Sequence, residues 1–132
     1  MRVVEKGEEM DHNRARDLYA LGKSAMKLGD LEAAAELFQQ SITKYPHFKT
    51  LELLGECLLK ENQHSEAIVY LAAAAGLGLK QFRSRFLLAK AHLAVGETGD
   101  AVNQLKEALR LNPNYKSAYK LLITLSANEE ES

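Results

Sequence analysis

The sequence contains no tryptophan, one cysteine and two prolines among its 132 residues. The scarcity of cysteine and of proline limits the kinds of fold that the chain can adopt. A single cysteine, Cys57, cannot form a disulfide within the chain, so a disulfide-stabilised fold is excluded. Proline interrupts helices, and its scarcity beside abundant Ala, Leu, Glu and Lys favours a helical protein. The chain also lacks the run of roughly eighteen apolar residues that a transmembrane helix needs, so we expect no membrane partner.

No strong charge imbalance is present either. Seventeen Lys and Arg residues face eighteen Asp and Glu residues, which gives a formal net charge of -1. A protein dedicated to nucleic acid usually carries a large basic excess, so we expect no nucleic-acid partner. The first residues turn acidic by Gly7-Glu8-Glu9 and lack the apolar stretch of a secretory signal. These features together predict a cytoplasmic protein of one domain.

Small and apolar residues recur along the chain at intervals of 33 and 34 residues. The first unit carries this set as Leu18, Leu21, Gly22, Ala25, Ala34, Phe38, Ser41 and Pro46. The second carries it as Leu51, Leu54, Gly55, Leu58, Ala67, Leu71 and Ala74, with Leu79 in place of the proline. The third carries it as Arg85, Leu88, Ala89, His92, Ala101, Leu105, Ala108 and Pro113. Because several positions recur together, the chain is built from three similar units.

This spacing resembles the tetratricopeptide repeat over about Ala15 to Tyr115. The match departs from the family pattern in three places. Leu18 and Arg85 stand where the pattern has tryptophan, His92 replaces an aromatic residue, and the second unit lacks its proline. The resemblance implies an all-α fold, in which antiparallel helix hairpins stack as a right-handed superhelical α-solenoid. It also implies a function in protein binding.

The period places the elements along the chain. We expect a single domain over residues 11–127, flanked by a flexible segment at 1–10 and an acidic flexible tail at 128–132. The repeats are expected at about 15–47, 48–81 and 82–115, followed by a capping helix over 116–127 that covers the open end of the stack. In the first repeat, the helices are expected from Arg14 to Leu28 and from Leu31 to Lys44.

Two glycines lie where helix interiors are expected. Glycine costs about 1 kcal/mol relative to alanine inside a helix, so Gly22 and Gly55 need a compensating reason. We predict that the partner helix approaches closely there, at Ala34 and Ala67. Gly29 and Gly96 belong to the turns between helices, where a left-handed backbone suits glycine.

No set of residues indicates catalysis, a metal or a cofactor. Cys57 occupies a small-residue position of a helix and is expected to be buried and inert. The four histidines are His12, His47, His64 and His92, and none pairs with another at the i, i+3 or i, i+4 spacing of a helical metal site. Glu52 and Glu56 share one helix face, but acid–base catalysis needs a pocket that separates their two pKa values. A broad groove does not provide one.

The resemblance implies which residues of each first helix line a concave groove. The first unit supplies Arg16, Tyr19, Lys23, Met26 and Lys27, and the second supplies Lys49, Glu52, Glu56, Leu59 and Lys60. The third supplies Arg83, Phe86, Lys90, Leu93 and Ala94, and the capping helix adds Ser117, Lys120 and Thr124. Eight basic residues against two acidic ones predict a basic groove for an acidic segment. The alternative is a solvated face in which Glu52 and Glu56 neutralise neighbouring lysines.

Some domains of this family clamp the terminal carboxylate of heat-shock chaperones with basic and amide side chains. The corresponding residues here are Tyr19, Lys23, Leu53, Arg83 and Leu87. Only Arg83 keeps the expected basic character in its place, so we predict no chaperone-tail binding of that kind.

The sequence therefore predicts a non-enzymatic adaptor that binds a partner peptide or helix, with an acidic segment, in its groove. Two alternatives stay open. The protein could self-associate through its capping helix, or through its acidic tail docked in its own or a neighbour's groove. It could also hold one dedicated client as a chaperone does. An enzyme or an RNA-binding protein is the least favoured reading.

Overall fold

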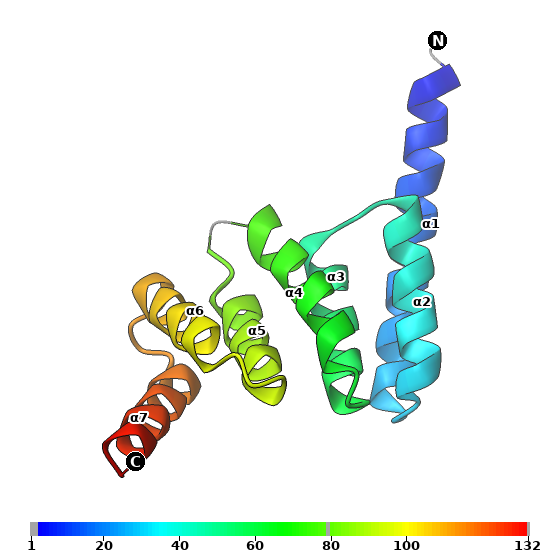
Figure 1. Ribbon diagram of the computed structural model, residues 1–132. Coiled ribbons are helices and arrows are strands. Elements are labelled where there is room, and N and C mark those ends of the chain that lie inside the picture. The colour runs from blue at the N-terminus through cyan, green and yellow to red at the C-terminus, as the bar shows by residue number, and fades with distance from the viewer. Residues whose placement is uncertain (1–2, 79, 132) are drawn as a thin grey trace.

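The computed structural model describes the backbone of residues 3–78 and 80–131, and the side-chain surroundings of 7–78 and 80–128. Within these residues the elements are all helices: α1 (Val3–Lys27), α2 (Leu31–Lys44), α3 (Phe48–Lys60), α4 (His64–Leu77), α5 (Phe82–Ala94), α6 (Thr98–Leu111) and α7 (Lys116–Glu131). Figure 1 shows them stacked in chain order, with the two termini at opposite ends of the stack.

Consecutive helices form antiparallel hairpins that pack on one another. The hairpins are α1 with α2, α3 with α4 and α5 with α6, and α2 packs on α3, α4 on α5 and α6 on α7. The first helices of the second and third hairpins, α3 and α5, also contact each other directly. This confirms the predicted all-α solenoid of stacked helix hairpins.

One large residue in the second helix of each hairpin is fully buried: Phe38, Leu71 and Leu105. These residues occupy equivalent places in the repeat, and each lies in a cluster of buried apolar side chains that joins neighbouring helices. Burial of each such side chain contributes about 1.5–3 kcal/mol. The repeat period therefore places one large, fully buried side chain in the second helix of each hairpin.

The two mid-helix glycines mark close helix contacts, as predicted, but the neighbour differs from the one expected. A Cβ atom on Gly22 would lie 2.5 Å from the ring of Phe38, and one on Gly55 would lie 2.4 Å from Cγ of Leu71. The prediction placed these contacts at Ala34 and Ala67. The large side chain one turn later fills the space instead, because side chains four residues apart share a helix face.

Left-handed residues connect the two helices of each hairpin, as predicted for Gly29 and Gly96. Gly29 and Gly96 both have φ of 82°, and Asn62 has φ of 62° in the second hairpin. Asp30 then begins α2, because its side chain accepts a hydrogen bond from the backbone N–H of Ala33 at 3.1 Å.

The ends of the helical stack differ from the prediction. Helix α1 begins at Val3 instead of Arg14, so helix occupies residues expected to be flexible, and α7 continues to Glu131 instead of Ala127. The added segments lack proline and are rich in Glu, which favours helix. In Figure 1 the first turns of α1 project beyond α2. The side chains of 129–131 and all of Ser132 lie outside the described residues, so tail docking stays a prediction.

Across the described residues, none of the helices is both long and apolar enough to cross a membrane.

Candidate functional site

The predicted groove residues lie on α1, α3 and α5, with further members on α7. On α1, Arg16, Lys23 and Lys27 are exposed, while Tyr19 and Met26 are half-buried. On α5, Lys90 and Ala94 are exposed, while Arg83, Phe86 and Leu93 are half-buried. On α7, Ser117, Lys120 and Thr124 are exposed. On α3, Lys60 is exposed, Lys49, Glu56 and Leu59 are half-buried and Glu52 is buried.

Glu52 is the centre of a polar cluster between α3 and α5, and only 2% of its side chain is exposed. Its Oε1 accepts hydrogen bonds from Nζ of Lys49 and a guanidinium nitrogen of Arg83, each at 2.8 Å, and its Oε2 accepts one from the hydroxyl of Ser84. Burial alone would raise the pKa of Glu52. The hydrogen bonds from Lys49, Ser84 and Arg83 outweigh burial and lower the pKa below its ordinary value.

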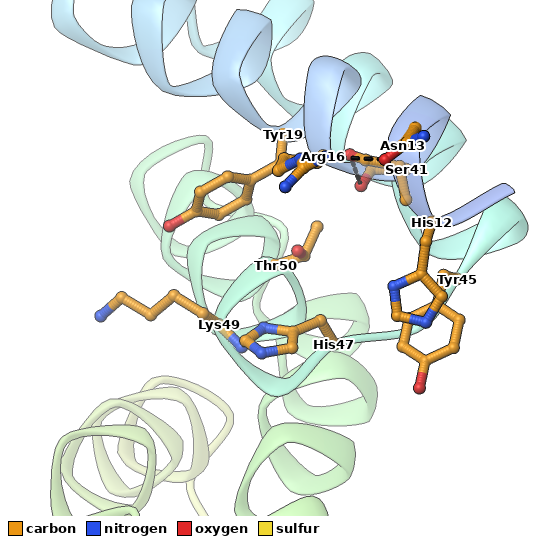
Figure 2. A pocket seen from close by; sticks show the side chains of 10 residues that line it. His12, Asn13, Arg16, Tyr19, Ser41, Tyr45, His47, Lys49 and Thr50 are labelled. Carbon is orange, nitrogen blue, oxygen red and sulfur yellow. Dashed lines mark hydrogen bonds between the residues drawn. The ribbon is translucent and has the colours of Figure 1, made fainter. Parts of the chain in front are cut away.

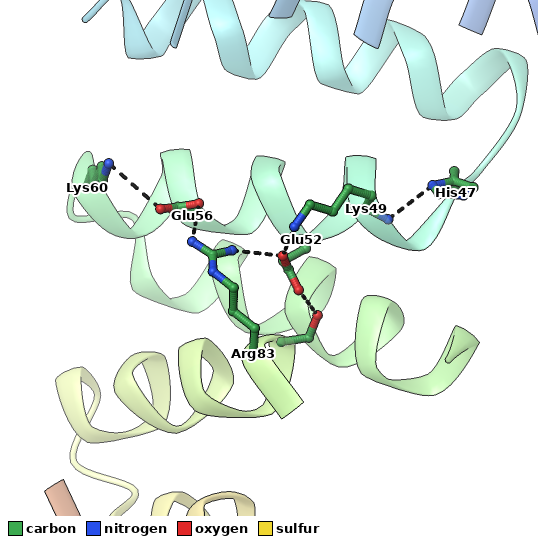
Figure 3. A network of polar contacts seen from close by, with 7 residues as sticks. His47, Lys49, Glu52, Glu56, Lys60 and Arg83 are labelled. Carbon is green, nitrogen blue, oxygen red and sulfur yellow. Dashed lines mark hydrogen bonds and ion pairs between the residues drawn. The ribbon is translucent and has the colours of Figure 1, made fainter. Parts of the chain in front are cut away.

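Glu56 extends this cluster one turn further along α3 (Figure 3). It accepts a hydrogen bond from the other terminal nitrogen of Arg83 at 2.9 Å and lies 3.8 Å from Nζ of Lys60. Arg83 therefore joins two carboxylates of α3 to α5.

These ion pairs neutralise much of the positive charge in the middle of the predicted basic groove. Three of its eight cations, Lys49, Lys60 and Arg83, are paired with Glu52 or Glu56. The expectation that Glu52 and Glu56 contact a ligand is not supported for Glu52, because a carboxylate that is buried and hydrogen-bonded on both oxygens has little left to offer one. The middle of the groove is close to neutral. The cations that form no ion pair with a described side chain lie on α1, α5 and α7.

An aromatic ring with a lysine one turn later occurs on each side of this neutral middle. The Nζ atom of Lys23 lies 5.4 Å from the ring centroid of Tyr19, and that of Lys90 lies 5.6 Å from the ring centroid of Phe86. Phe86 also contacts Tyr115 edge-on at 5.4 Å between centroids. The first and third repeats thus each present a lysine beside an aromatic ring, which places a cation next to an apolar surface.

A cleft of about 420 Å³ opens at the first repeat, between α1 and the start of α3 (Figure 2). It is lined by His12, Asn13, Ala15, Arg16, Tyr19, Ser41, Tyr45, His47, Lys49 and Thr50. Ser41 is buried in its wall and donates a hydrogen bond to the backbone carbonyl of Ala15 at 2.7 Å. The rings of His12 and Tyr45 lie against each other with centroids 3.6 Å apart.

Seven of the ten residues that line this cleft were not predicted as groove residues. Arg16, Tyr19 and Lys49 were predicted as groove residues, but His12, Tyr45 and His47 were not. The last two lie in the connection after α2, and His12 lies on the part of α1 that precedes the repeat pattern. The one available signal was the presence of two histidines and a tyrosine close to the predicted repeat boundaries.

Other candidate residues prove structural. Cys57 is fully buried, and burial, with a smaller contribution from Glu56, raises the pKa of its thiol to about 11, so it is a poor nucleophile at neutral pH. The ligand atoms of His92, Glu97 and Asp100 lie within 4.8 Å of one another at the start of α6. Glu97 and Asp100 are exposed at a helix N-terminus, where negative charge offsets the helix dipole, and this accounts for them without an ion.

Comparison with known proteins identifies the repeats. Descriptions of the tetratricopeptide repeat match residues 19–78 and residues 82–125. The chain is 29% identical over 105 residues to DnaJ homolog subfamily C member 3 of Gallus gallus. That match covers 79% of this chain and spans 21% of the length of the relative.

Solved structures share the same fold. MamA from Desulfovibrio magneticus RS-1 superposes with a TM-score of 0.83 at 24% identity, covering 89% of this chain and 67% of that one. The first repeat domain of Spaghetti (RPAP3) bound to the HSP90 peptide SRMEEVD gives 0.86 at 17% identity, covering 90% and 95%. The Yersinia enterocolitica type III secretion chaperone SycD in complex with a peptide of the translocator YopD gives 0.81 at 23% identity, covering 86% and 93%.

Proposed function

Because the chain belongs to the tetratricopeptide repeat family, we propose that it is a protein-interaction module that binds an acidic peptide or helix of a partner along α1, α3 and α5. The observation that carries this proposal is the arrangement of cations and rings on both sides of the neutral middle. Lys23 beside Tyr19 and Lys90 beside Phe86 offer a charge and an apolar surface at two separate points. A segment with acidic residues toward both ends fits this pattern better than a uniformly acidic one.

Similar proteins support binding of a peptide without fixing its sequence. Two of the solved structures with this fold contain a peptide, one from HSP90 and one from YopD. The residues at the chaperone-clamp positions argue against the first kind of ligand. Arg83 is the basic residue expected there, and both of its terminal nitrogens are bound to Glu52 and Glu56. Leu53 and Leu87, which hold no hydrogen-bonding side-chain group, are buried.

The test compares partner capture by charge-reversed variants. Lys23→Glu with Lys90→Glu removes the two ring-associated cations without touching the Glu52 cluster. Lys44→Glu with Lys106→Glu reverses two exposed lysines of α2 and α6 and serves as the control, because these helices are the second ones of their hairpins. We expect wild type and the control to capture the same partner from cell extract, and the Lys23/Lys90 variant to lose it.

The captured complex should also weaken as salt is raised, since exposed charge pairs are screened over about 10 Å at 0.1 M salt. Equal capture by both double variants would place the binding surface elsewhere and overturn the proposal.

Self-association is a second candidate, favoured by one observation. Tyr119 and Ile123 of α7 are 57% and 49% exposed, and they lie one turn apart on the same side of the last helix. Sedimentation of wild type beside Ile123→Glu over a range of concentrations tests it. A wild-type dimer that Ile123→Glu dissociates would support this candidate, whereas a monomer at every concentration would exclude it.

A further inference from the structure

The cleft between α1 and the start of α3 is a feature of the first repeat alone. His12 and Asn13, which form one of its walls, belong to the turns of α1 that precede the repeat pattern. The equivalent helices α3 and α5 begin at Phe48 and Phe82 and have no such turns. The early start of α1 therefore adds a wall that the other hairpins lack.

The cleft is lined by positively charged side chains and by no negatively charged one. None of the ten residues that line it is Asp or Glu, although the chain holds eighteen of them. Arg16 donates a hydrogen bond to Oδ1 of Asn13 at 2.7 Å and forms no ion pair with any residue whose side chain the structure describes. Lys49 is partly neutralised by Glu52, so Arg16 is the main free cation.

The ring of His47 offers the cleft a second donor. Nδ1 of His47 accepts a hydrogen bond from the backbone N–H of Lys49 at 3.2 Å, which starts α3. In the neutral ring the hydrogen must then sit on Nε2, and that atom is available to donate to a ligand. Figure 2 shows Arg16 and Tyr19 on one side of the opening and His47 and Lys49 on the other.

The remaining wall is apolar and aromatic. Ala15 and the two contacting rings of His12 and Tyr45, which are tilted by 39° to each other, provide surface for a large side chain, and a volume of about 420 Å³ accommodates one or two residues of a peptide. A ligand that fits this combination carries a negative group next to an apolar one.

We propose that this cleft is an anchor pocket for a carboxylate of the bound peptide and the apolar side chain next to it. Arg16 and His47 hold the carboxylate, and Tyr45 with His12 contacts the apolar side chain. The proposal rests on the proposed function, because it names a ligand for one end of the same surface. The residues involved differ from the chaperone-clamp positions except for Tyr19. Figure 1 shows α7 at the opposite end of the stack from α1, so the ligand named here is a peptide of another molecule.

The test is fluorescence anisotropy of the full chain with labelled peptides. The first probe is Gly-Ser-Glu-Asp-Glu-Leu-Phe with a free carboxyl terminus, the second is the same peptide with a terminal amide, and the third has Gln and Asn in place of its acidic side chains. We expect the first probe to bind about tenfold more tightly than whichever probe lacks the anchoring carboxylate, because a charge-assisted hydrogen bond is lost. A weak second probe would identify the terminal carboxylate as the anchor, and a weak third probe would identify a side-chain carboxylate.

Variants locate the effect in the cleft. Arg16→Gln removes the free cation from an exposed position, and His47→Asp removes the ring N–H donor while the aspartate carboxylate can still accept the hydrogen bond that begins α3. Each should abolish most of the preference between the probes. Lys90→Gln, at the other end of the groove, should weaken all probes without changing the preference.

Equal binding of the three probes, a preference retained in Arg16→Gln, or no binding of any probe would overturn the anchor pocket. The outcome is separable from the proposed function, because capture of a partner that depends on Lys23 and Lys90 would stand even if the pocket failed.

Discussion

At the scale of single residues, Glu52 has the most instructive environment, because it carries a negative charge with only 2% of its side chain exposed. Removing a carboxylate from water is costly, and here Lys49, Arg83 and Ser84 compensate with hydrogen bonds to both oxygens. Two of these partners belong to α5. The carboxylate therefore fixes how the second hairpin sits against the third.

Substitution of this residue should lower stability. Glu52→Gln keeps the size of the side chain but removes the charge, so one donor of the cluster loses its acceptor. We expect a loss of about 1–3 kcal/mol in the free energy of unfolding, measured by urea titration. Glu107→Gln is the matched control, since Glu107 pairs with Arg110 on the surface and should give no measurable change. A control variant as unstable as Glu52→Gln would contradict the assignment.

The same residue should also contribute to acid sensitivity. The pKa of Glu52 is lower in the folded protein than its ordinary value of 4.5, so its stabilisation is present above that value. The stabilisation is lost as the pH falls from there through the lowered folded pKa. Wild type should therefore lose stability more steeply than Glu52→Gln below about pH 4.5, in urea titrations at a series of pH values. Parallel curves would show that Glu52 does not titrate differently in the folded state.

At the scale of helices, the spacing between hairpin partners depends on one small residue. Gly55→Ala would place a Cβ atom 2.4 Å from Cγ of the fully buried Leu71, whereas Gly76, later in α4, has nothing within 4 Å of an added Cβ. Overpacking typically costs about 1–3 kcal/mol, and the better helix propensity of alanine returns at most about 1 kcal/mol.

Thermal or urea unfolding should thus show Gly55→Ala destabilised by about 1–2 kcal/mol and Gly76→Ala stabilised by a few tenths to about 1 kcal/mol. The two substitutions are chemically the same, so their opposite signs test the helix contact itself. If both stabilised the protein, the hairpin would have to be looser at Gly55 than the structure has it.

Helices could be predicted from the sequence where the repeat pattern covers them, and less well beyond it. The range of α2, Leu31–Lys44, was predicted to the residue, because Asp30 and Gly29 signal its start and Pro46 limits its end. The start of α1 was missed, because the turns before Arg14 carry no apolar period that would extend the repeat pattern. The repeat period predicts which face of a helix a residue occupies. It does not predict which oppositely charged side chain a charged residue will pair with.

At the scale of the whole molecule, that distinction explains how much of the candidate site was predictable. The family resemblance predicted Lys49, Arg83 and Glu52 for one groove, but only the packing of α3 against α5 decides that they neutralise each other. The anchor pocket depends in the same way on two segments far apart in the sequence, one holding His12 and the other holding Tyr45 and His47.

The stacking of hairpins also gives leucines at the same repeat position different exposed fractions along the chain. Leu21, Leu54 and Leu88 occupy the same position of the repeat, but Leu21 is 56% exposed while Leu54 and Leu88 are 1% and 3% exposed. The difference follows from the stack, because α2 packs on α3 and α4 packs on α5, whereas the side of α1 that carries Leu21 is exposed. Leu54→Ala and Leu88→Ala should each cost about 2–5 kcal/mol in the free energy of unfolding, and Leu21→Ala less than about 0.5 kcal/mol.

Urea titration of the three variants at two protein concentrations measures these losses of stability. A concentration-dependent loss in Leu21→Ala would mean that a second copy covers the outer face of α1, in the place that a preceding hairpin takes on α3 and α5.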